Sequence, residues 1–480
     1  MLVRQFALSG LGHLSTLVAD QRWGLAAIVD PRRDVDVYVA AARAEGVRIT
    51  HVLETHLHND YVSGGRELAA SVGAQHVIGR GAELRFEHRP LADREEFLVG
   101  DLRIVALETP GHTPEHVAYA VADTARADEP WLLLTGGSLL VGSVGRTDLL
   151  GVENALPFAR AQFKSLHDVV LRHEDFVGVY PTHGAGSLCS ANISATPAST
   201  IGFERRHNPY LEPADAESFA RLLLADQPAF PSYFAHMRGI NQAGPTPIGT
   251  IPAPAPLSPA DVRAAIDGGA ALVDLRSMGD HGAGHVPGSI SIPLGSSFAT
   301  WLGWTVEFGR PLVYVLPDRA VWEEAVRWSY RIGFDDVRGY LDGGIDAWRA
   351  AGLPEEATRQ MSVEDLAAAL DAGDADAPLV IDVRQASEYA AGHVPASVHI
   401  GAGELPSRLA ELPRDRPIAV ICASGYRSSI GASLLRRAGF TNVSNVTRGL
   451  PHWSACGLPV ARGESAGGEA PAAPLVTHAH

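Results

Sequence analysis

Residues 420–429 read Val-Ile-Cys-Ala-Ser-Gly-Tyr-Arg-Ser-Ser, and this stretch predicts a buried strand that turns into a helix. The apolar run before Cys422 is typical of a central strand, and the helix is expected from about Ser428 to Ala438. A loop of this kind points backbone N–H groups inward and adds the positive end of the helix dipole. Such a setting favours the thiolate of a cysteine, which is its nucleophilic form.

Two further residues of the loop fit a sulfur-transfer site. Gly425 permits a tight backbone turn that a β-carbon would obstruct. Arg427 offers a fork of donors to an anionic substrate. We therefore predict Cys422 and Arg427 as catalytic residues, and Ser424 and Gly425 as substrate-binding residues. The predicted chemistry is a cysteine that takes a sulfane sulfur, holds it as a persulfide and passes it on.

The sequence around this loop has a second copy upstream, at a period of about 106 residues. Leu272-Val-Asp-Leu-Arg276 matches Val380-Ile-Asp-Val-Arg384, and Gly284-His-Val-Pro-Gly-Ser289 matches Gly392-His-Val-Pro-Ala-Ser397. Each copy alternates strands with helices. This alternation predicts, for each copy, a parallel sheet with helices on both faces.

The first copy lacks the residues that would make it reactive. Leu316 stands where Cys422 would be, and Val321 replaces the loop arginine. We therefore expect a structural or interface module. The remaining cysteines, Cys189 and Cys456, lie in no comparable loop, and Cys456 is predicted to be passive.

Length and composition predict three α/β domains. The chain has 480 residues, too many for one hydrophobic core. We place the first domain at 1–245, a Pro-rich linker at 246–257, the two copies at 258–356 and 360–462, and a disordered tail at 463–480. In the first domain, strands are expected at Leu25–Asp30, Ile49–Glu54, Arg103–Leu107, Val117–Val121 and Trp131–Leu134, with a helix at Val35–Glu45.

Charge and cysteine content limit the partners and the compartment. A net charge of −16 argues against nucleic acid and against an anionic membrane surface. Three cysteines cannot form a disulfide framework, which fits a reducing compartment. The N-terminal stretch lacks a sustained apolar core, so neither a signal peptide nor a membrane span is expected. We predict a cytoplasmic protein, with a homodimer as the default assembly.

A second group of reactive side chains precedes the repeat. Thr55-His-Leu-His-Asn-Asp-Tyr61 follows a predicted strand, and an extended segment would place His56 and His58 on one side with the aspartate. His112 and His183 follow two later strands. Imidazoles and a carboxylate at strand ends are typical metal ligands. We predict a metal site that includes His56, His58 and His112.

These motifs resemble two known families. Asp382-Val-Arg384, Gly392-His-Val-Pro395 and the cysteine loop resemble a single-domain rhodanese, which is a sulfurtransferase. Four residues separate Cys422 from Arg427, whereas related phosphatases have five, so we set a phosphatase aside. The histidine pattern, with Gly145-Arg-Thr-Asp148, resembles the metallo-β-lactamase fold, an αββα sandwich, and within it the persulfide dioxygenase and glyoxalase II branch.

The domain order resembles the persulfide dioxygenase–rhodanese fusions. That resemblance implies a mononuclear Fe(II), one per chain, held by two histidines and one aspartate, with open positions for O₂ and the persulfide. Carried over by position, the two histidines are His56 and His112, and Arg146 is predicted to bind substrate. The implied function is O₂-dependent oxidation of a low-molecular-weight thiol persulfide, of glutathione or a similar thiol, to sulfite. Cys422 would exchange sulfur with thiosulfate or sulfite.

Two departures from the family keep alternatives open. Tyr61 stands where binuclear hydrolases have a further histidine, which removes a ligand of the second metal. Gly137 stands where the family has its iron-binding aspartate, so His58, Asp60 or His116 would have to complete the site. One alternative is a thiosulfate-type sulfurtransferase whose metallo-β-lactamase domain is degenerate. Another is a glyoxalase II-like thioester hydrolase with a single Zn²⁺ on the three predicted histidines.

Overall fold

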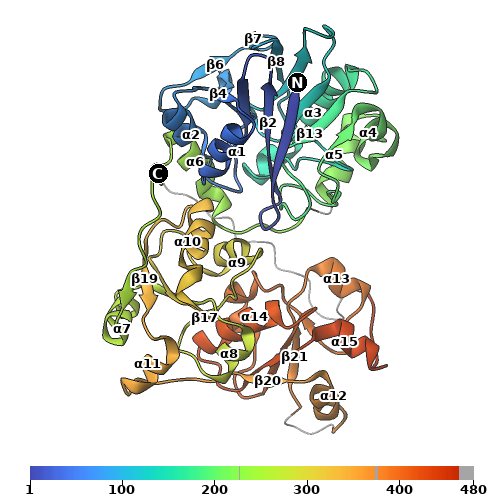
Figure 1. The fold of residues 1–480 in the computed structure, drawn as a ribbon. Helices are drawn as coiled ribbons and strands as arrows, with labels where there is room; N and C mark the ends of the chain where they lie inside the picture. The colour runs from blue at the N-terminus through green and yellow to red at the C-terminus, as the bar shows by residue number, and fades with distance from the viewer. Residues whose placement is uncertain (226, 373–376, 464–480) are drawn as a thin grey trace. The chain divides into compact units, whose positions relative to one another are not determined.

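The computed structural model describes residues 1–225, 227–372 and 377–463 (Figure 1). These residues divide into two compact units. The first unit comprises residues 1–254, 295–311 and 320–337. The second begins at residue 255 and holds the other described residues. From residue 464 onward the predicted tail lies outside the described residues. The predicted domain boundaries stay a prediction.

Two six-stranded sheets pack face to face in the N-terminal domain (Figure 1). The first sheet has the order β1 (Leu2–Leu8), β2 (His13–Asp20), β3 (Leu25–Val29), β4 (Arg48–Glu54), β5 (Gln75–Gly79) and β6 (Arg89–Leu91). The second has the order β14 (Ser199–Thr200), β13 (Gly178–Pro181), β10 (Leu132–Gly136), β9 (Val117–Asp123), β8 (Leu102–Glu108) and β7 (Glu96–Val99). A buried apolar cluster from both sheets, including Leu53 and Tyr119, fills the space between them.

Helices cover the outer face of each sheet. Tyr38 and Leu68 pack α1 (Asp36–Ala44) and α2 (Gly65–Val72) on the first sheet. On the second sheet, Leu166 belongs to α3 (Val152–Asp168) and Phe219 to α5 (Ala216–Ala225). The predicted αββα sandwich is therefore confirmed. The remaining elements of this domain are η1 (Arg80–Ala82), β11 (Leu139–Leu140), β12 (Ser143–Val144), η2 (Val170–Arg172), α4 (Ile201–His207), η3 (Pro209–Leu211) and α6 (Phe234–Ala243).

The two repeat copies form five-stranded sheets with the same strand order. The first reads β15 (Pro256–Leu257), β19 (Val337–Leu341), β18 (Leu312–Val315), β16 (Ala271–Asp274) and β17 (Ile290–Ser291). The second reads β20 (Arg359–Met361), β24 (Val443–Val446), β23 (Ile418–Ile421), β21 (Leu379–Asp382) and β22 (Val398–His399). All strand pairs of the second copy are parallel, as are the β15–β19, β16–β18 and β16–β17 pairs of the first, in agreement with the alternating pattern.

In both copies, a tryptophan of the last helix is hydrogen-bonded to the segment that follows that helix. The indole N–H of Trp348 donates to the carbonyl of Pro354, and that of Trp453 to Pro459, each at 2.7 Å. The helices of the first copy are α7 (Pro259–Asp267), α8 (Met278–Ala283), α9 (Phe298–Thr305), α10 (Trp322–Arg331, after η4, Arg319–Val321) and α11 (Gly344–Ala350). Those of the second are α12 (Val363–Asp371), α13 (Ala386–Ala391), η5 (Leu405–Ser407), η6 (Leu409–Glu411), α14 (Tyr426–Arg437) and α15 (Gly449–Ala455). In the described parts of the chain, no helix combines the length and apolar character needed to cross a membrane.

Helices α9 and α10 belong to the first compact unit, although their sequence belongs to the first repeat copy. Two ion pairs hold α10 to the N-terminal domain, one buried and one partly exposed. Arg331 donates to the carboxylate of Asp34 from Nε at 2.9 Å and from Nη2 at 2.7 Å. Arg33 makes a similar two-point contact, of 2.5 and 2.8 Å, with Asp335, just after the helix. Sequence patterns predict neither pair, because the partners lie about 300 residues apart.

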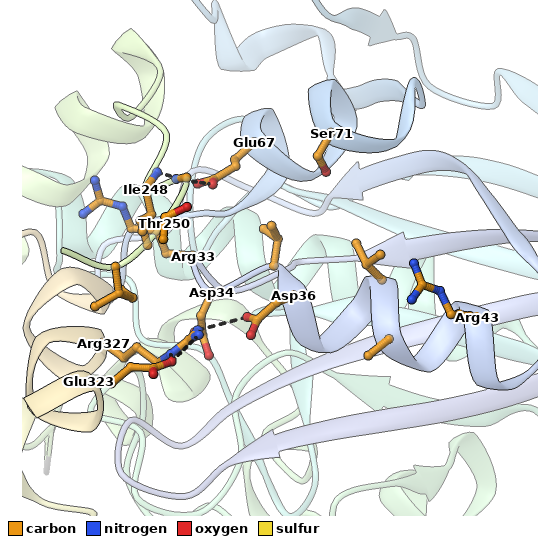
Figure 2. Close-up of a pocket in the computed structure, with 15 residues that line it drawn as sticks. Arg33, Asp34, Asp36, Arg43, Glu67, Ser71, Ile248, Thr250, Glu323 and Arg327 are labelled. Carbon is orange, nitrogen blue, oxygen red and sulfur yellow. Dashed lines mark hydrogen bonds and ion pairs between the residues drawn. The ribbon is translucent and has the colours of Figure 1, made fainter. Parts of the chain in front are cut away.

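The Pro-rich connector also binds this unit. The carboxylate of Glu67 accepts the backbone N–H groups of Ile248 and Gly249, both at 2.8 Å. A cavity of about 620 Å³ is lined by the connector and by helices α1, α2 and α10 (Figure 2). Its wall includes the ion pair of Arg327 with Asp36. These contacts fix the connector over this stretch.

Replacing Asp34 with alanine would leave the Arg331 guanidinium buried without its carboxylate. We expect the free energy of unfolding of the first unit to fall by about 3 kcal/mol. The matched control is Asp36→Ala, which removes an exposed carboxylate 3.0 Å from Arg327 and is expected to cost less than about 1 kcal/mol. Urea unfolding measures both, and equal losses would contradict the structural role of the buried pair.

Candidate functional site

Three strand ends meet at the buried carboxylate of Asp30, directly after β3. Thr55, which follows β4, donates to it from the backbone N–H at 2.7 Å and from the hydroxyl at 2.8 Å. The hydroxyl of Thr182, which follows β13, donates to the same carboxylate. Asp30 has a φ of +50°, a left-handed conformation that aspartate tolerates better than most residues. This clamp fixes where the segments carrying His56 and His183 begin.

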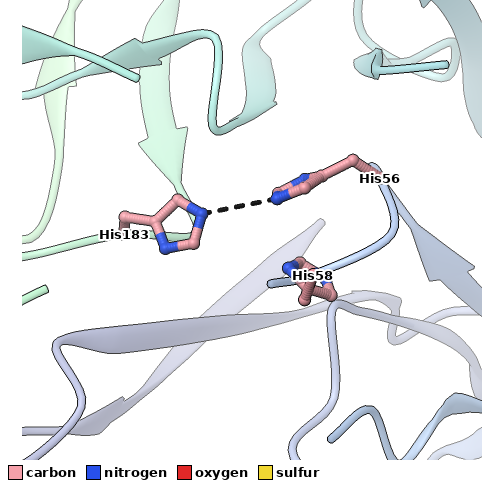
Figure 3. A group of neighbouring side chains, drawn as sticks. All are labelled: His56, His58 and His183. Carbon is pink, nitrogen blue, oxygen red and sulfur yellow. Dashed lines mark hydrogen bonds between the residues drawn. The ribbon is translucent and has the colours of Figure 1, made fainter. Parts of the chain in front are cut away.

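Four imidazole rings gather beside the clamp. The ring of His56 lies 4.1 Å from that of His58, 4.8 Å from His112 and 5.5 Å from His183, measured between centroids. The Nε2 atoms of His56 and His183 are 3.4 Å apart (Figure 3). Each ring is at most 2% exposed. Several imidazole nitrogens can therefore reach one shared point.

The protein orients His112 from both sides. Its backbone N–H donates to the side-chain oxygen of Gln162, on α3, at 2.8 Å. Its Nδ1 lies 2.8 Å from the backbone carbonyl of Arg146 and must donate to it. The Nε2 atom therefore keeps its lone pair, which is the arrangement found in metal-binding histidines.

Arg146 makes its contacts within the protein. Its guanidinium donates to Asp148 at 2.6 and 2.7 Å, and to the carbonyls of Leu188 at 2.9 Å and Pro228 at 2.6 Å. The residue is 2% exposed. These bonds hold the carbonyl that orients His112, whereas the predicted contact with substrate stays a prediction.

His116 is hydrogen-bonded to Gly137, the residue that stands in place of the expected carboxylate. Its Nε2 accepts the backbone N–H of Gly137 at 2.9 Å, so its Nδ1 carries the proton that bonds Thr109 at 2.8 Å. Both ring nitrogens are used, which removes His116 from the candidate ligands. A β-carbon on Gly137 would lie 2.2 Å from Cδ2 of His112, so this backbone leaves no room for an aspartate there.

Asp60 and His58 have different surroundings. Asp60 Oδ2 lies 3.3 Å from Nδ1 of His183, so this carboxylate orients a histidine. His58 Nε2 lies 3.2 Å from the carboxylate of Asp30, while its buried Nδ1 has no hydrogen-bond partner among the described residues. Ligand atoms of His56, His58 and His183 lie within 4.8 Å of one another, as do those of His112, His183 and Cys189.

Burial controls the charge of these rings. It lowers the pKa of His56 well below its usual value and that of His112 to about 3, so both are neutral at pH 7. Burial alone would also lower the pKa of His183, but Cys189 and the Asp60 carboxylate raise it above the usual value. A bound metal would displace that proton.

The residues present fit a single ion. Imidazole nitrogens are suitable ligands for zinc and iron. Nδ1 of His58 has no hydrogen-bond partner among the described residues, and Nε2 of His112 keeps its lone pair, so both atoms are available to a metal ion. Tyr61, in place of the further histidine, directs its hydroxyl to the carbonyl of Asp30 at 3.4 Å. The second ion of a binuclear site therefore lacks ligands from Tyr61 and Gly137.

The second site is the loop after β23. The sulfur of Cys422 is buried, with the Gly425 N–H 3.2 Å away and the Ser428 hydroxyl 3.4 Å away. Gly425 has a φ of +100°, which a residue with a β-carbon rarely adopts. Helix α14 begins at the next residue, so donors and the helix dipole act on the same sulfur. The predicted substrate-binding Ser424 is exposed in this loop.

Arg427 is already engaged by a carboxylate. Its Nη1 and Nη2 donate to Glu388, on α13, at 2.5 and 2.8 Å. Burial alone would raise the pKa of Glu388, but the bonds from Arg427 lower it, so Glu388 is ionised at pH 7. An anion that approached this guanidinium would have to compete with Glu388 for its donors.

The first repeat copy forms part of the wall around the loop. The hydroxyl of Tyr426 donates to the carbonyl of Pro293 at 3.0 Å, and the hydroxyls of Ser429 and Ser291 are 2.9 Å apart. A β-carbon on Gly425 would lie 3.0 Å from the sulfur of Met278. The copy without a cysteine thus supports the copy that has one.

Sequence reasoning missed Asp30 and Gln162. A signal for Asp30 was present, because the predicted strand Leu25–Asp30 ends in a carboxylate, as the other strands end in histidines. Gln162 carries no such signal, since it is one polar residue on a long helix.

Comparisons with known proteins agree with this architecture. Residues 258–351 and 362–456 each match the rhodanese-like domain family. The hydroxyacylglutathione hydrolase of Methylococcus capsulatus is 32% identical over 228 residues, 45% of this chain and 88% of that protein. That of Rhizobium etli is 28% identical over 245 residues, 47% of this chain and 92% of that protein.

A solved metallo-β-lactamase from Staphylococcus aureus is 31% identical, with a TM-score of 0.64. It covers 71% of this chain and 98% of its own, so the similarity extends beyond the N-terminal domain. The chain belongs to the metallo-β-lactamase family, with two rhodanese-like domains fused behind its metallo-β-lactamase domain.

Proposed function

We propose that the chain transfers sulfane sulfur through a persulfide on Cys422 and oxidises a low-molecular-weight thiol persulfide at its histidine cluster. The main support for sulfur transfer is the set of hydrogen-bond donors around the Cys422 sulfur. The Gly425 N–H and the Ser428 hydroxyl lie 3.2 and 3.4 Å from it, at the start of α14. Donors in this arrangement stabilise negative charge on a thiolate or a persulfide.

The transfer has two balanced steps. The Cys422 thiolate attacks the outer sulfur of thiosulfate, a new S–S bond forms, and sulfite leaves with the electron pair of the broken S–S bond. An acceptor thiolate, such as glutathione, then attacks the outer sulfur of the cysteine persulfide and releases the Cys422 thiolate. The Arg427 fork binds the anionic donor when Glu388 yields part of its two bonds.

Incubation with thiosulfate should add the mass of one sulfur atom to Cys422 alone. We expect mass spectrometry of the digested chain to find this addition on the peptide that contains Cys422. The peptides with Cys189 and Cys456 serve as internal controls, since neither thiol lies in such a loop. Cys422→Ser should lose thiosulfate sulfurtransferase activity. Full activity in that variant would exclude the proposed nucleophile.

Glu388→Gln should strengthen binding of anionic donors. Removing this carboxylate frees the Arg427 guanidinium and removes one negative charge that repels the anionic donor. We therefore expect the KM for thiosulfate to fall by roughly three- to tenfold. The matched control is Glu411→Gln, which changes an exposed partner of Arg408 in the same domain and should leave the KM unchanged. Steady-state kinetics test this, and a higher KM in Glu388→Gln would mean that Glu388 aids donor binding.

The second activity rests on the single-ion character of the histidine cluster. His56, His58 and His183, whose ligand atoms lie within 4.8 Å of one another, would hold the ion, with Asp60 beside Nδ1 of His183. His112, oriented by the Arg146 carbonyl, would contribute its free Nε2. A bound Fe(II) supplies open coordination positions for O₂ and for the persulfide sulfur. The balanced reaction converts a thiol persulfide, O₂ and water into the thiol, sulfite and two protons.

The two proposed activities share their small molecules. Sulfite, the product of the oxidation, can accept sulfur from the Cys422 persulfide and give thiosulfate. The thiol released by the oxidation can also accept sulfur from the Cys422 persulfide, which forms a thiol persulfide again. The curated relatives are named hydroxyacylglutathione hydrolases, so a thioester is the competing substrate class. The loss of second-metal ligands at Tyr61 and Gly137 favours the one-ion oxidation.

Metal content and oxygen uptake test this half. We expect iron-loaded protein to consume O₂ when given glutathione persulfide, and His112→Ala and His183→Ala to lose both iron and uptake. The matched control is His116→Gln, because an amide can keep the bonds to Gly137 and Thr109 and the ring is not a ligand. Zinc-dependent hydrolysis of S-lactoylglutathione without O₂ uptake would replace the dioxygenase with a thioester hydrolase.

A further inference from the structure

A third cluster of metal-binding side chains lies outside the sites described above, where α12 meets α15. His452 lies in α15, and Cys456 caps the end of that helix four residues later. Residues four apart share one face of a helix. Glu364, in the first turn of α12, approaches that face. Ligand atoms of the three residues lie within 4.8 Å of one another.

The separations between these atoms match the edges of a coordination tetrahedron. His452 Nε2 lies 3.0 Å from Glu364 Oε1, Cys456 Sγ lies 3.5 Å from the same oxygen, and Sγ lies 3.7 Å from Nε2. Around a zinc ion, Zn–N, Zn–O and Zn–S bonds place N and O about 3.3 Å apart and sulfur about 3.5 Å from either. Small side-chain movements would therefore suffice to bind an ion.

We propose that Glu364, His452 and Cys456 form a second metal site, which binds one zinc-class divalent ion. Thiolate, imidazole and carboxylate are the three ligand types that zinc takes from proteins. Glu364 and Cys456 are exposed and His452 is partly exposed, so an ion can enter from solvent and complete its shell with water. This assignment replaces the sequence-based expectation that Cys456 is passive.

The ion would link two helices near the sulfur-transfer loop. It would clamp the start of α12 to the end of α15, in place of the hydrogen bonds that now join them. At its other end, α15 bonds the loop directly, because the Leu450 N–H donates to the carbonyl of Cys422 at 2.9 Å. The expected role is structural, since a metal joining two helices stabilises the folded state that binds it.

Cobalt titration of the full-length, metal-stripped chain tests the proposal. Co²⁺ bound to a thiolate gives a near-ultraviolet charge-transfer band, which imidazole and carboxylate ligands do not produce. We expect the wild-type chain to show this band and Zn²⁺ to abolish it by displacement. Cys456→Ser should lack the band, whereas Cys422→Ser and Cys189→Ser should keep it. No band in the wild type, or an undiminished band in Cys456→Ser, would overturn the proposal.

Two further variants separate ligand loss from misfolding. Glu364→Gln and His452→Ala should each raise the Kd for Co²⁺ at least tenfold, whereas Glu411→Gln, an exposed change in the same domain, should not. Glu364→Gln, His452→Ala and Cys456→Ser should keep the metal-free melting temperature of the wild type, because these side chains are exposed or partly exposed. Zinc should raise that temperature in the wild type more than in Cys456→Ser. Equal Kd values in the wild type and both ligand variants would overturn the proposal.

Discussion

The histidine cluster depends on one buried carboxylate, that of Asp30. Removing such a group from water costs several kcal/mol unless donors replace the lost hydration. Here Thr55 and His58, which follow β4, and Thr182, which follows β13, supply those donors. Burial alone would raise the pKa of Asp30, but the neighbouring His58 and these hydrogen bonds lower it, so the charge persists. Keeping the carboxylate satisfied therefore requires the segments with His56 and His183 to converge.

The two unusual residues of the cluster are one coupled change. Gly137 looks like the loss of a ligand, and His116 looks like an extra histidine without a partner. In the folded chain, the His116 ring accepts the Gly137 N–H at 2.9 Å, while the His112 ring lies against the bare Cα of Gly137. Restoring an aspartate alone would push a side chain into His112. Imidazole rings on both sides of Gly137 therefore occupy the space that a carboxylate at this position would need.

What the sequence could predict follows from the range of the interactions. The strands and the helix at Val35–Glu45 follow from local apolar periodicity, and the structure confirms them within two residues at each end. The Cys422 loop is likewise local, since its donors, Gly425 and Ser428, lie within six residues of the sulfur. The pairing of His56 with His183 spans 127 residues, and no single-sequence pattern gives such contacts. For the same reason, the self-contained hydrogen bonding of Arg146 became visible only in the fold.

The first repeat copy shows why a rhodanese-like fold persists without its cysteine. By the repeat offset, its Trp322 stands where the second copy has Ser428, a neighbour of the Cys422 sulfur. The indole N–H of Trp322 donates instead to the carbonyl of Pro252, in the Pro-rich connector, at 2.8 Å. Helix α10, which begins at Trp322, carries Arg331 and its buried bond to Asp34. The same fold position thus lies beside the Cys422 sulfur in one copy and bonds the connector in the other. A cysteine at Leu316 alone would lack the hydroxyl neighbour that Cys422 has in Ser428, because Trp322 stands at that position and its indole N–H is bonded to Pro252.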